Sequence, residues 1–163
     1  MKISIILHDL RSAYNVGSIL RSCDAFGVHT VFIGGYSPFP EIPGDQRLPH
    51  VRIKQTRLIS KTALGAERAT NIEIYEDIHG LIESLKNQGV RVLALEQDCT
   101  STQLSDYQQE SDIALLIGRE VEGIDPYLSK QCDIVLEIPM RGSKESLNVS
   151  VAAAIALYHF AVK

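Results

Sequence analysis

The sequence has few cysteines. Cys23, Cys99 and Cys132 are the only three in 163 residues, and no two of them form a C-x-x-C pair. An odd number at wide spacing argues against a disulfide framework and favours a reducing compartment. No group of Cys and His residues has the spacing of a zinc site, so we expect no metal.

The sequence also lacks a long apolar segment. The apolar run at residues 3–7 is too short for a signal peptide. The longest apolar stretch, Val149 to Val162, is interrupted by Ser150 and His159 and is too short to span a bilayer. We expect this stretch to form a buried helix, and we expect a cytoplasmic protein that has no membrane partner.

Positive charge is not in excess. The formal net charge is −4, which argues against nucleic-acid binding unless cations gather locally. Two segments do hold such cations, namely Arg47, Arg52, Lys54, Arg57 and Lys61 in the first and Arg141 and Lys144 in the second. Each of these charges could equally be an ordinary solvated surface charge.

No linker, internal repeat or low-complexity tract divides the chain. Hydrophobic residues make up 45% of it, enough for one packed core. We therefore expect a single domain over residues 1–163. Short apolar runs alternate with helical patterns, which predicts an α/β fold with a mostly parallel sheet flanked by helices.

The expected elements can be placed by residue. Strands are predicted at Ile3–Leu7, Thr30–Gly34, Ile72–Tyr75, Val90–Leu95, Ile113–Ile117 and Ile134–Ile138. Helices are predicted at Val16–Phe26, Asp77–Asn87 and Ser146–Ala161, with a short one from Asp125. The segment Tyr36–Lys61 contains Pro38, Pro40, Pro43 and Pro49. It is therefore predicted to be a long loop, either functional or disordered.

The first junction that could carry chemistry lies at residues 15–21, between a strand and a helix. The helix has one apolar stripe, made of Val16, Ile19, Leu20, Cys23 and Phe26. Arg21 points roughly 160° away from that stripe, so it faces solvent or a ligand. Asn15 could cap the helix, and Gly17 permits a close backbone approach. A capped helix that carries a surface charge would show the same pattern.

The second junction directly follows the predicted strand Ile113–Ile117. Gly118 and Gly123 flank Glu120 there. In open α/β sheets, ligands bind outside the carboxyl ends of the strands. Gly118 could let a ligand lie against the backbone, and Glu120 could accept a hydrogen bond or fix the loop. A tight turn that needs glycine for its dihedral angles would show the same sequence pattern.

The third junction spans residues 138–150 and again joins a strand to a helix. Ser146 is a natural N-cap, and Asn148 adds an amide in the first turn. Free backbone N–H groups at a helix start suit a polar ligand. A capped helix that packs its alanine-rich face against the sheet accounts for the same residues.

Together, the three junctions resemble the SpoU (TrmH-like) family of RNA ribose 2′-O-methyltransferases, within the SPOUT superfamily. That family carries N-x-G-x-x-x-R near its start, G-x-E-x-x-G after a late strand, and I-P-M followed by S-L-N-V-S before a final helix. The corresponding residues here are Asn15, Gly17 and Arg21, then Gly118, Glu120 and Gly123, then Ile138, Pro139 and Met140 with Ser146, Leu147, Asn148, Val149 and Ser150. The resemblance covers essentially the whole chain.

The resemblance implies transfer of a methyl group from S-adenosyl-L-methionine to a ribose 2′-hydroxyl of tRNA or rRNA. It also implies a C-terminal trefoil knot that holds this cofactor, and a homodimer. The cofactor would lie against Leu95, Glu96, Ile117, Gly118, Ile138, Met140 and Leu147. The catalytic group would be Arg21, acting on the target ribose and supplied by either subunit, with Asn15, Glu120, Ser146 and Asn148. RNA would be contacted by Arg11, Arg119, Arg141 and Lys144.

The chain also departs from the family pattern. Residue 119 is Arg, where many members have a small polar residue, and neither a separate RNA-binding domain nor a basic extension is expected. RNA binding would then fall to the core domain, the dimer groove or another partner. One alternative is a non-catalytic RNA- or cofactor-binding protein on the same fold. Another is a nucleotide-dependent oxidoreductase, which should show a G-x-G-x-x-G motif that residues 15–18 do not supply.

Overall fold

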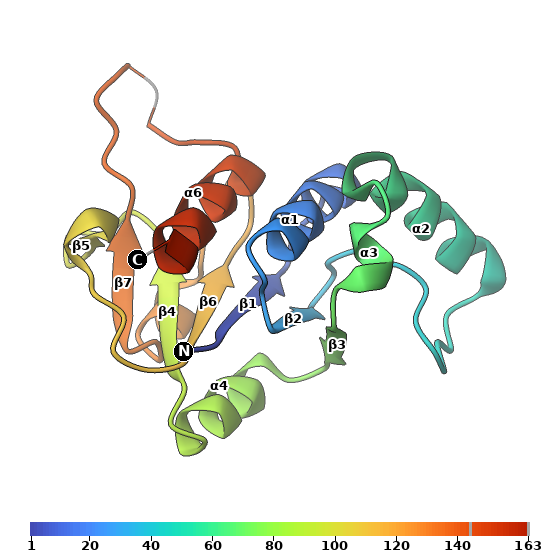
Figure 1. Cartoon of the computed structure of the whole chain (residues 1–163), viewed down its shortest axis with the longest axis horizontal. Coiled ribbons are helices and arrows are strands. Elements are labelled where there is room, and N and C mark those ends of the chain that lie inside the picture. The colour runs from blue at the N-terminus through green and yellow to red at the C-terminus, as the bar shows by residue number, and fades with distance from the viewer. Residues whose placement is uncertain (144, 163) are drawn as a thin grey trace.

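The computed structural model describes residues 1–143 and 145–162, and its centre is a seven-stranded sheet (Figure 1). The strands are β1 (Ile3–His8), β2 (Thr30–Gly34), β3 (Ile72–Tyr75), β4 (Arg91–Leu95), β5 (Thr102–Gln103), β6 (Ile113–Ile117) and β7 (Ile134–Glu137). They lie in the order β3-β2-β1-β6-β4-β7-β5, and every pairing between them is parallel. The parallel sheet predicted from the alternation of elements is confirmed.

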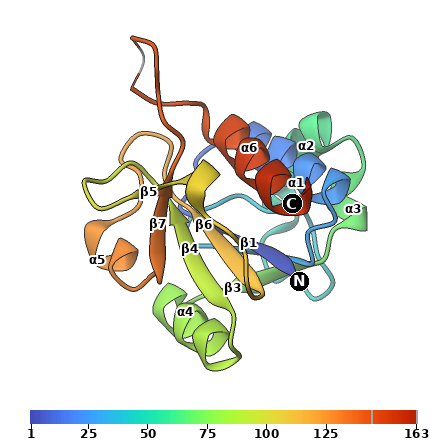
Figure 2. The ribbon, with the colours of Figure 1, turned by 60° about the vertical axis from the view of Figure 1, so that its left-hand side comes forward.

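Helices cover both faces of the sheet. One face carries α1 (Ala13–Ala25), α2 (Pro49–Ala63), α3 (Ala66–Ala69) and α6 (Val149–Val162), and the other carries α4 (Ile78–Asn87) and α5 (Pro126–Ser129) (Figure 2). A 3₁₀ turn, η1 (Leu104–Asp106), follows β5. Because strand side chains alternate, Ile5 and Leu7 pack under α1 and α6, whereas Ile6 packs under α4. None of the helices described is long and apolar enough to cross a membrane.

Two helix caps predicted near the site are wrong. The cap of α1 lies three residues before the predicted Asn15, and the cap of α6 lies two residues after the predicted Ser146. Helix α1 begins at Ala13, because the Ser12 hydroxyl accepts a hydrogen bond from the Asn15 N–H at 3.2 Å. Asn15 therefore lies inside the first turn. Helix α6 begins at Val149, and the Asn148 side chain accepts from the Ser150 N–H at 2.9 Å, which leaves Ser146 outside the helix. Serine and asparagine are comparable caps, so the sequence did not discriminate between them.

The prediction of a loop over Tyr36–Lys61 is wrong for its second half, where α2 forms. Pro49 occupies the first helical position, where a missing N–H costs nothing and the fixed φ favours the helix. The preceding residues are ordered around Arg47. Its guanidinium donates to the carbonyl oxygens of Phe39 and Pro40 and pairs with Asp45, whose carboxyl pKa it lowers to about 2.

Gly17 sets how closely α1 and α2 approach. A Cβ placed on Gly17 would overlap the Thr62 hydroxyl and the carbonyl oxygen of Ile59. Gly17→Ala should therefore lower the free energy of unfolding, by about 1–3 kcal/mol as overpacking usually does. Urea denaturation with Ser18→Ala as the neighbouring control would measure it. Helix propensity alone predicts that Gly17→Ala raises the free energy of unfolding by about 1 kcal/mol instead. Such an increase would contradict the close packing of α1 against α2.

Candidate functional site

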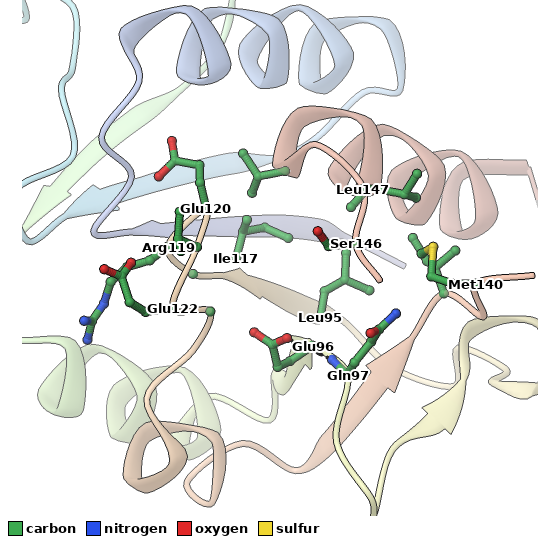
Figure 3. Close-up of a pocket in the computed structure, with 16 residues that line it drawn as sticks. Leu95, Glu96, Gln97, Ile117, Arg119, Glu120, Glu122, Met140, Ser146 and Leu147 are labelled. Atoms are coloured by element: carbon green, nitrogen blue, oxygen red, sulfur yellow. Dashed lines mark hydrogen bonds between the residues drawn. The ribbon is translucent and has the colours of Figure 1, made fainter. Parts of the chain in front are cut away.

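The candidate site is a cavity of about 190 Å³ at the carboxyl ends of β4, β6 and β7, beside the start of α6 (Figure 3). Its lining comes from the second and third junctions and from the end of β4. The residues are Leu95, Glu96, Gln97, Ile117, Gly118, Arg119, Glu120, Val121, Glu122, Gly123, Ile138, Met140, Ser146, Leu147, Val149 and Ala152. Parallel strands end at the same edge of a sheet, which is why segments distant in sequence meet here.

The residues predicted to hold a cofactor all lie on this cavity. They are Leu95, Glu96, Ile117, Gly118, Ile138, Met140 and Leu147. Two residues predicted as catalytic, Glu120 and Ser146, line it as well, and so does Arg119. Leu95, Ile117 and Ile138 lie at or just after the ends of three neighbouring strands and give the lining apolar surface, while Glu96 and Glu120 add carboxylates.

One chain of hydrogen bonds joins the three junctions. The Asn15 amide nitrogen donates to Glu120 Oε1 at 3.2 Å. The Asn15 amide oxygen accepts from Asn148 Nδ2 at 3.3 Å. Asn15 is therefore the common partner of a carboxylate after β6 and an amide before α6. It does not line the cavity itself but ties together two of the segments that do.

Glu120 also fastens the start of α1. Its carboxylate points toward α1 in Figure 3 and accepts from the backbone N–H of Arg11 and of Ser12, both at 3.1 Å. Partial burial acts to raise the pKa of Glu120, but these hydrogen bonds and the one from Asn15 outweigh it and hold the pKa below its ordinary value. Glu120 therefore stays ionised. Ionised Glu120 therefore stabilises the fold. This stabilisation is fully present above the pKa that Glu120 has in the unfolded chain, and it is lost as the pH falls through the lower pKa of the folded state.

The loop after β6 is closed by its own contacts. Arg119 and Gly123 exchange two backbone hydrogen bonds of 3.2 Å, and Glu96 accepts from the Ile124 N–H at 2.9 Å. A Cβ on Gly118 would lie 2.6 Å from Ile124 Cγ1. Gly123 has φ of +70°, and a Cβ there would overlap the Glu96 carboxylate. The packing of the loop therefore explains both glycines before any ligand is considered.

The remaining residues predicted to be catalytic or to contact RNA are not part of the described lining. Arg21 is exposed on α1, opposite its buried stripe, as the helical spacing predicted. Arg11 is exposed and its guanidinium pairs with Glu122 at 2.8 Å. Arg141 is exposed in the segment between β7 and α6. Lys144 lies outside the described residues.

Arg119 is held at the edge of the site. Its side chain is one-third exposed and extends away from the middle of the cavity in Figure 3. Its Nε lies 3.9 Å from an oxygen of Asp9, which directly follows β1. Arg119 therefore presents its charge beside the cavity rather than inside it.

Several lining residues were not among the predicted site residues. Gln97 lies two positions after Leu95, where the predicted strand ends, and directly follows Glu96. Val149 and Ala152 are three apart at the start of α6, a spacing that places both on one face of a helix. That spacing was a usable signal, but it is shared with residues that pack into the core.

The parallel sheet, with its cavity at the carboxyl ends of the late strands, matches solved SpoU methyltransferase structures over 97% of the chain, and this match shows the α/β-knot fold. The chain belongs to the SpoU rRNA Methylase family, whose sequence model matches residues 2–158. The family assignment made from the three junctions is thus confirmed.

Individual relatives agree with the family. The chain is 32% identical over 154 residues to a 23S rRNA (guanosine-2′-O-)-methyltransferase RlmB of Coxiella burnetii, covering 94% of this chain and 56% of that protein. The chain thus spans about half the length of the curated relatives it matches. The A. aeolicus TrmH/SpoU tRNA modifying enzyme superposes with a TM-score of 0.79 at 23% identity, covering 97% of this chain and 73% of that one. An AdoMet-bound rRNA methyltransferase from Sinorhizobium meliloti superposes with a TM-score of 0.78 at 22% identity, and the match covers 97% of this chain and 55% of that one.

Proposed function

We propose that this chain transfers a methyl group from S-adenosyl-L-methionine to a ribose 2′-hydroxyl of RNA, either tRNA or rRNA. The observation that carries the proposal is that the second and third family motifs line one cavity, and that Asn15 of the first motif links Glu120 to Asn148 beside it. Family membership and the activity of the Coxiella burnetii relative, a guanosine-2′-O-methyltransferase, support the same reaction.

The lining of the cavity fits the cofactor. Leu95, Ile117 and Ile138 offer an apolar surface suited to an adenine ring. The negative charges of Glu96 and Glu120 in the lining favour a ligand whose amino group and sulfonium are both cationic. Met140 and Leu147 close the side next to α6. We assign these residues, with Gly118, to cofactor binding.

When bound, the cofactor supplies a methyl group on a sulfonium, which an oxygen can displace in line. The residues of the chain must then hold the ribose hydroxyl in position and accommodate the proton that leaves it. Arginine is a poor base because its pKa exceeds about 12. We assign Arg21 instead the role of a fixed cation that stabilises negative charge as it develops on the ribose oxygen. Asn15, Glu120, Ser146 and Asn148 would order the loops and the hydroxyl.

We propose that Arg21 acts in the cavity of a second subunit. Arg21 is exposed on α1 and does not belong to the described lining of the cavity. The homodimer would bring the Arg21 of one chain to the cavity of the other. The same face of α1 carries Tyr14, seven residues earlier, which is 45% exposed.

Helix α6 offers a surface for such a dimer. Its exposed apolar residues, Val151, Ile155, Tyr158 and Val162, follow a helical spacing and form one stripe. Ile155, Tyr158 and Val162 also line a groove that Ile138 completes beside the cavity. Burying this stripe in a second copy would place the subunit interface next to the proposed cofactor site.

Charge on the α6 stripe should dissociate the dimer. The chain should scatter light as twice its 18.0 kDa mass, and Ile155→Asp with Tyr158→Asp should return it to the monomer mass because two carboxylates cannot be buried there unpaired. Ile53→Asp is the matched control, because Ile53 is 63% exposed on α2. A wild-type protein of monomer mass at all concentrations would reject the dimer.

The cofactor assignment predicts binding that a single side chain can disrupt. Calorimetry should show S-adenosyl-L-methionine binding with competition by S-adenosylhomocysteine. Leu147→Arg places a cation on the apolar wall and should weaken binding at least about tenfold, since burying an unpaired charge is costly. Ile53→Arg should bind normally. Binding of NAD in place of either ligand would favour an oxidoreductase.

The non-catalytic alternative shares the fold and the cavity. It predicts cofactor or RNA binding without methyl transfer, so a methyl-transfer assay distinguishes the two functions.

We also propose a cytoplasmic location, where RNA is available and where the free thiols of Cys23, Cys99 and Cys132 would remain reduced.

A further inference from the structure

Helix α2 carries a one-sided stripe of cations. Lys54, Arg57 and Lys61 stand three and four residues apart and are all exposed, while Ile59 and Ala63 on the opposite side are buried. The helix has no acidic residue in its fifteen positions. A chain with net charge −4 therefore presents one helix face that is purely positive.

Other cations of the same segment are used internally. Arg47 is wrapped by loop carbonyl groups and by Asp45, and Arg52 pairs with Glu41 at 3.0 Å. In the part of the chain that the structure describes, Lys54 and Arg57 make no ion pair. The two kinds of cation in this segment thus differ, and only the stripe is available to an anionic partner.

The stripe runs toward the candidate site. Lys61 Nζ lies 5.9 Å from the centre of the Tyr14 ring, and the Thr62 hydroxyl donates to the Tyr14 carbonyl oxygen at 2.9 Å. Figure 1 shows the end of α2 beside α1. Tyr14 is exposed, and the next residue, Asn15, is the one that bonds Glu120 on the cavity wall. Cations and an aromatic ring therefore form one path to the site.

We propose that this path binds single-stranded RNA, with phosphates along Lys54, Arg57 and Lys61 and one base stacked on Tyr14. The inference rests on the proposed function and adds the route by which the substrate reaches it. Lysine and arginine supply phosphate contacts, and an exposed ring accepts an unpaired base of any sequence. From Lys54 to Lys61 the helix rises about 10 Å, the reach of a few nucleotides.

The charge of the path can be tested by salt dependence. Binding of a labelled mixed-sequence RNA of about 20 nucleotides is measured by fluorescence anisotropy from low to high salt. For Lys54→Gln with Arg57→Gln, the slope of log affinity against log salt should flatten by about 1.4, and affinity at 0.1 M salt should fall roughly 25-fold. The matched control is Lys2→Gln with Lys130→Gln, two exposed cations outside α2, and it should bind as the wild type does.

The ring is tested separately. Tyr14→Ala should raise the KM for RNA about tenfold with little change in kcat, because a stacked base contributes equally to the ground state and the transition state. Tyr14→Phe should restore the KM, whereas Tyr14→Leu, which keeps apolar bulk without a flat ring, should not.

The outcomes separate this inference from the proposed function. A wild-type enzyme that methylates RNA, together with an α2 double variant of unchanged affinity and salt slope, would overturn the path and leave the function intact. A wild-type protein that binds RNA through α2 but transfers no methyl group would overturn the function instead. Preference of the stripe for an acidic protein over RNA at equal salt would also overturn the path.

Discussion

Arg21→Ala is expected to lower methyl transfer by about 10²–10³-fold, the usual loss when one donor to developing charge is removed. The fold should remain intact, because Arg21 is exposed and lies opposite the buried stripe of α1. Such surface changes generally alter the free energy of unfolding by less than about 0.5 kcal/mol. Cofactor affinity should also be preserved, since Arg21 does not line the described cavity.

Two further variants sharpen this experiment. Arg21→Lys keeps the charge but loses the planar fork of donors, so partial activity would show that geometry matters as well as charge. Arg68→Ala, whose side chain is 89% exposed on α3, is the matched control and should keep full activity. Full activity of Arg21→Ala would remove this residue from the mechanism and leave it an ordinary surface charge.

Glu120→Ala is expected to cost about 10²-fold in methyl transfer for a different reason. Glu120 holds the start of α1 through Arg11 and Ser12 and holds Asn15 through its amide. Without it, the first and second motifs lose their connection, and displacement of reacting groups by about 1 Å can cost this much. Unlike Arg21→Ala, this variant should also weaken cofactor binding, because Glu120 lines the cavity.

The neighbouring carboxylate provides the control. Glu122 also lines the cavity, but its contact is an exposed ion pair with Arg11, which solvent screens strongly. Glu122→Ala should therefore retain most activity. Equal losses in the two variants would mean that negative charge near the cavity matters and that the hydrogen bonds of Glu120 do not.

The cavity lining was predictable because of the sheet. In a parallel sheet, the residue after each strand lies at the same edge, so Glu96, Gly118 and Ile138 had to come close once β4, β6 and β7 were identified as strands. The family motifs then picked out Met140 and Leu147, in a segment that is neither strand nor helix. Strand periodicity alone would have missed both.

Contacts between distant segments were not predictable. Asn15 and Asn148 are 133 positions apart, and their hydrogen bond depends on β6 and β4 lying between β1 and β7. The role of Gly17 depends on Thr62 in the same way. Local spacing suggested a cap at Asn15, whereas tertiary structure made this residue the link between motifs.

Helix α2 was missed because all four prolines of residues 36–61 were interpreted as signs of a loop. Pro49 starts the helix, whereas Pro38, Pro40 and Pro43 lie in the irregular segment before it. Once the helix is placed, the cations of residues 47–61 divide into those that hold the loop and those that form a stripe. That division was invisible in the sequence, where all five looked alike.

The most direct test of the central claim is methyl transfer from labelled S-adenosyl-L-methionine to RNA isolated from cells that lack this protein. After digestion of the RNA to nucleosides, we expect label in a 2′-O-methylated nucleoside, and we expect this label to disappear with Arg21→Ala. Label on a base, or no transfer by a protein that demonstrably binds the cofactor, would contradict it.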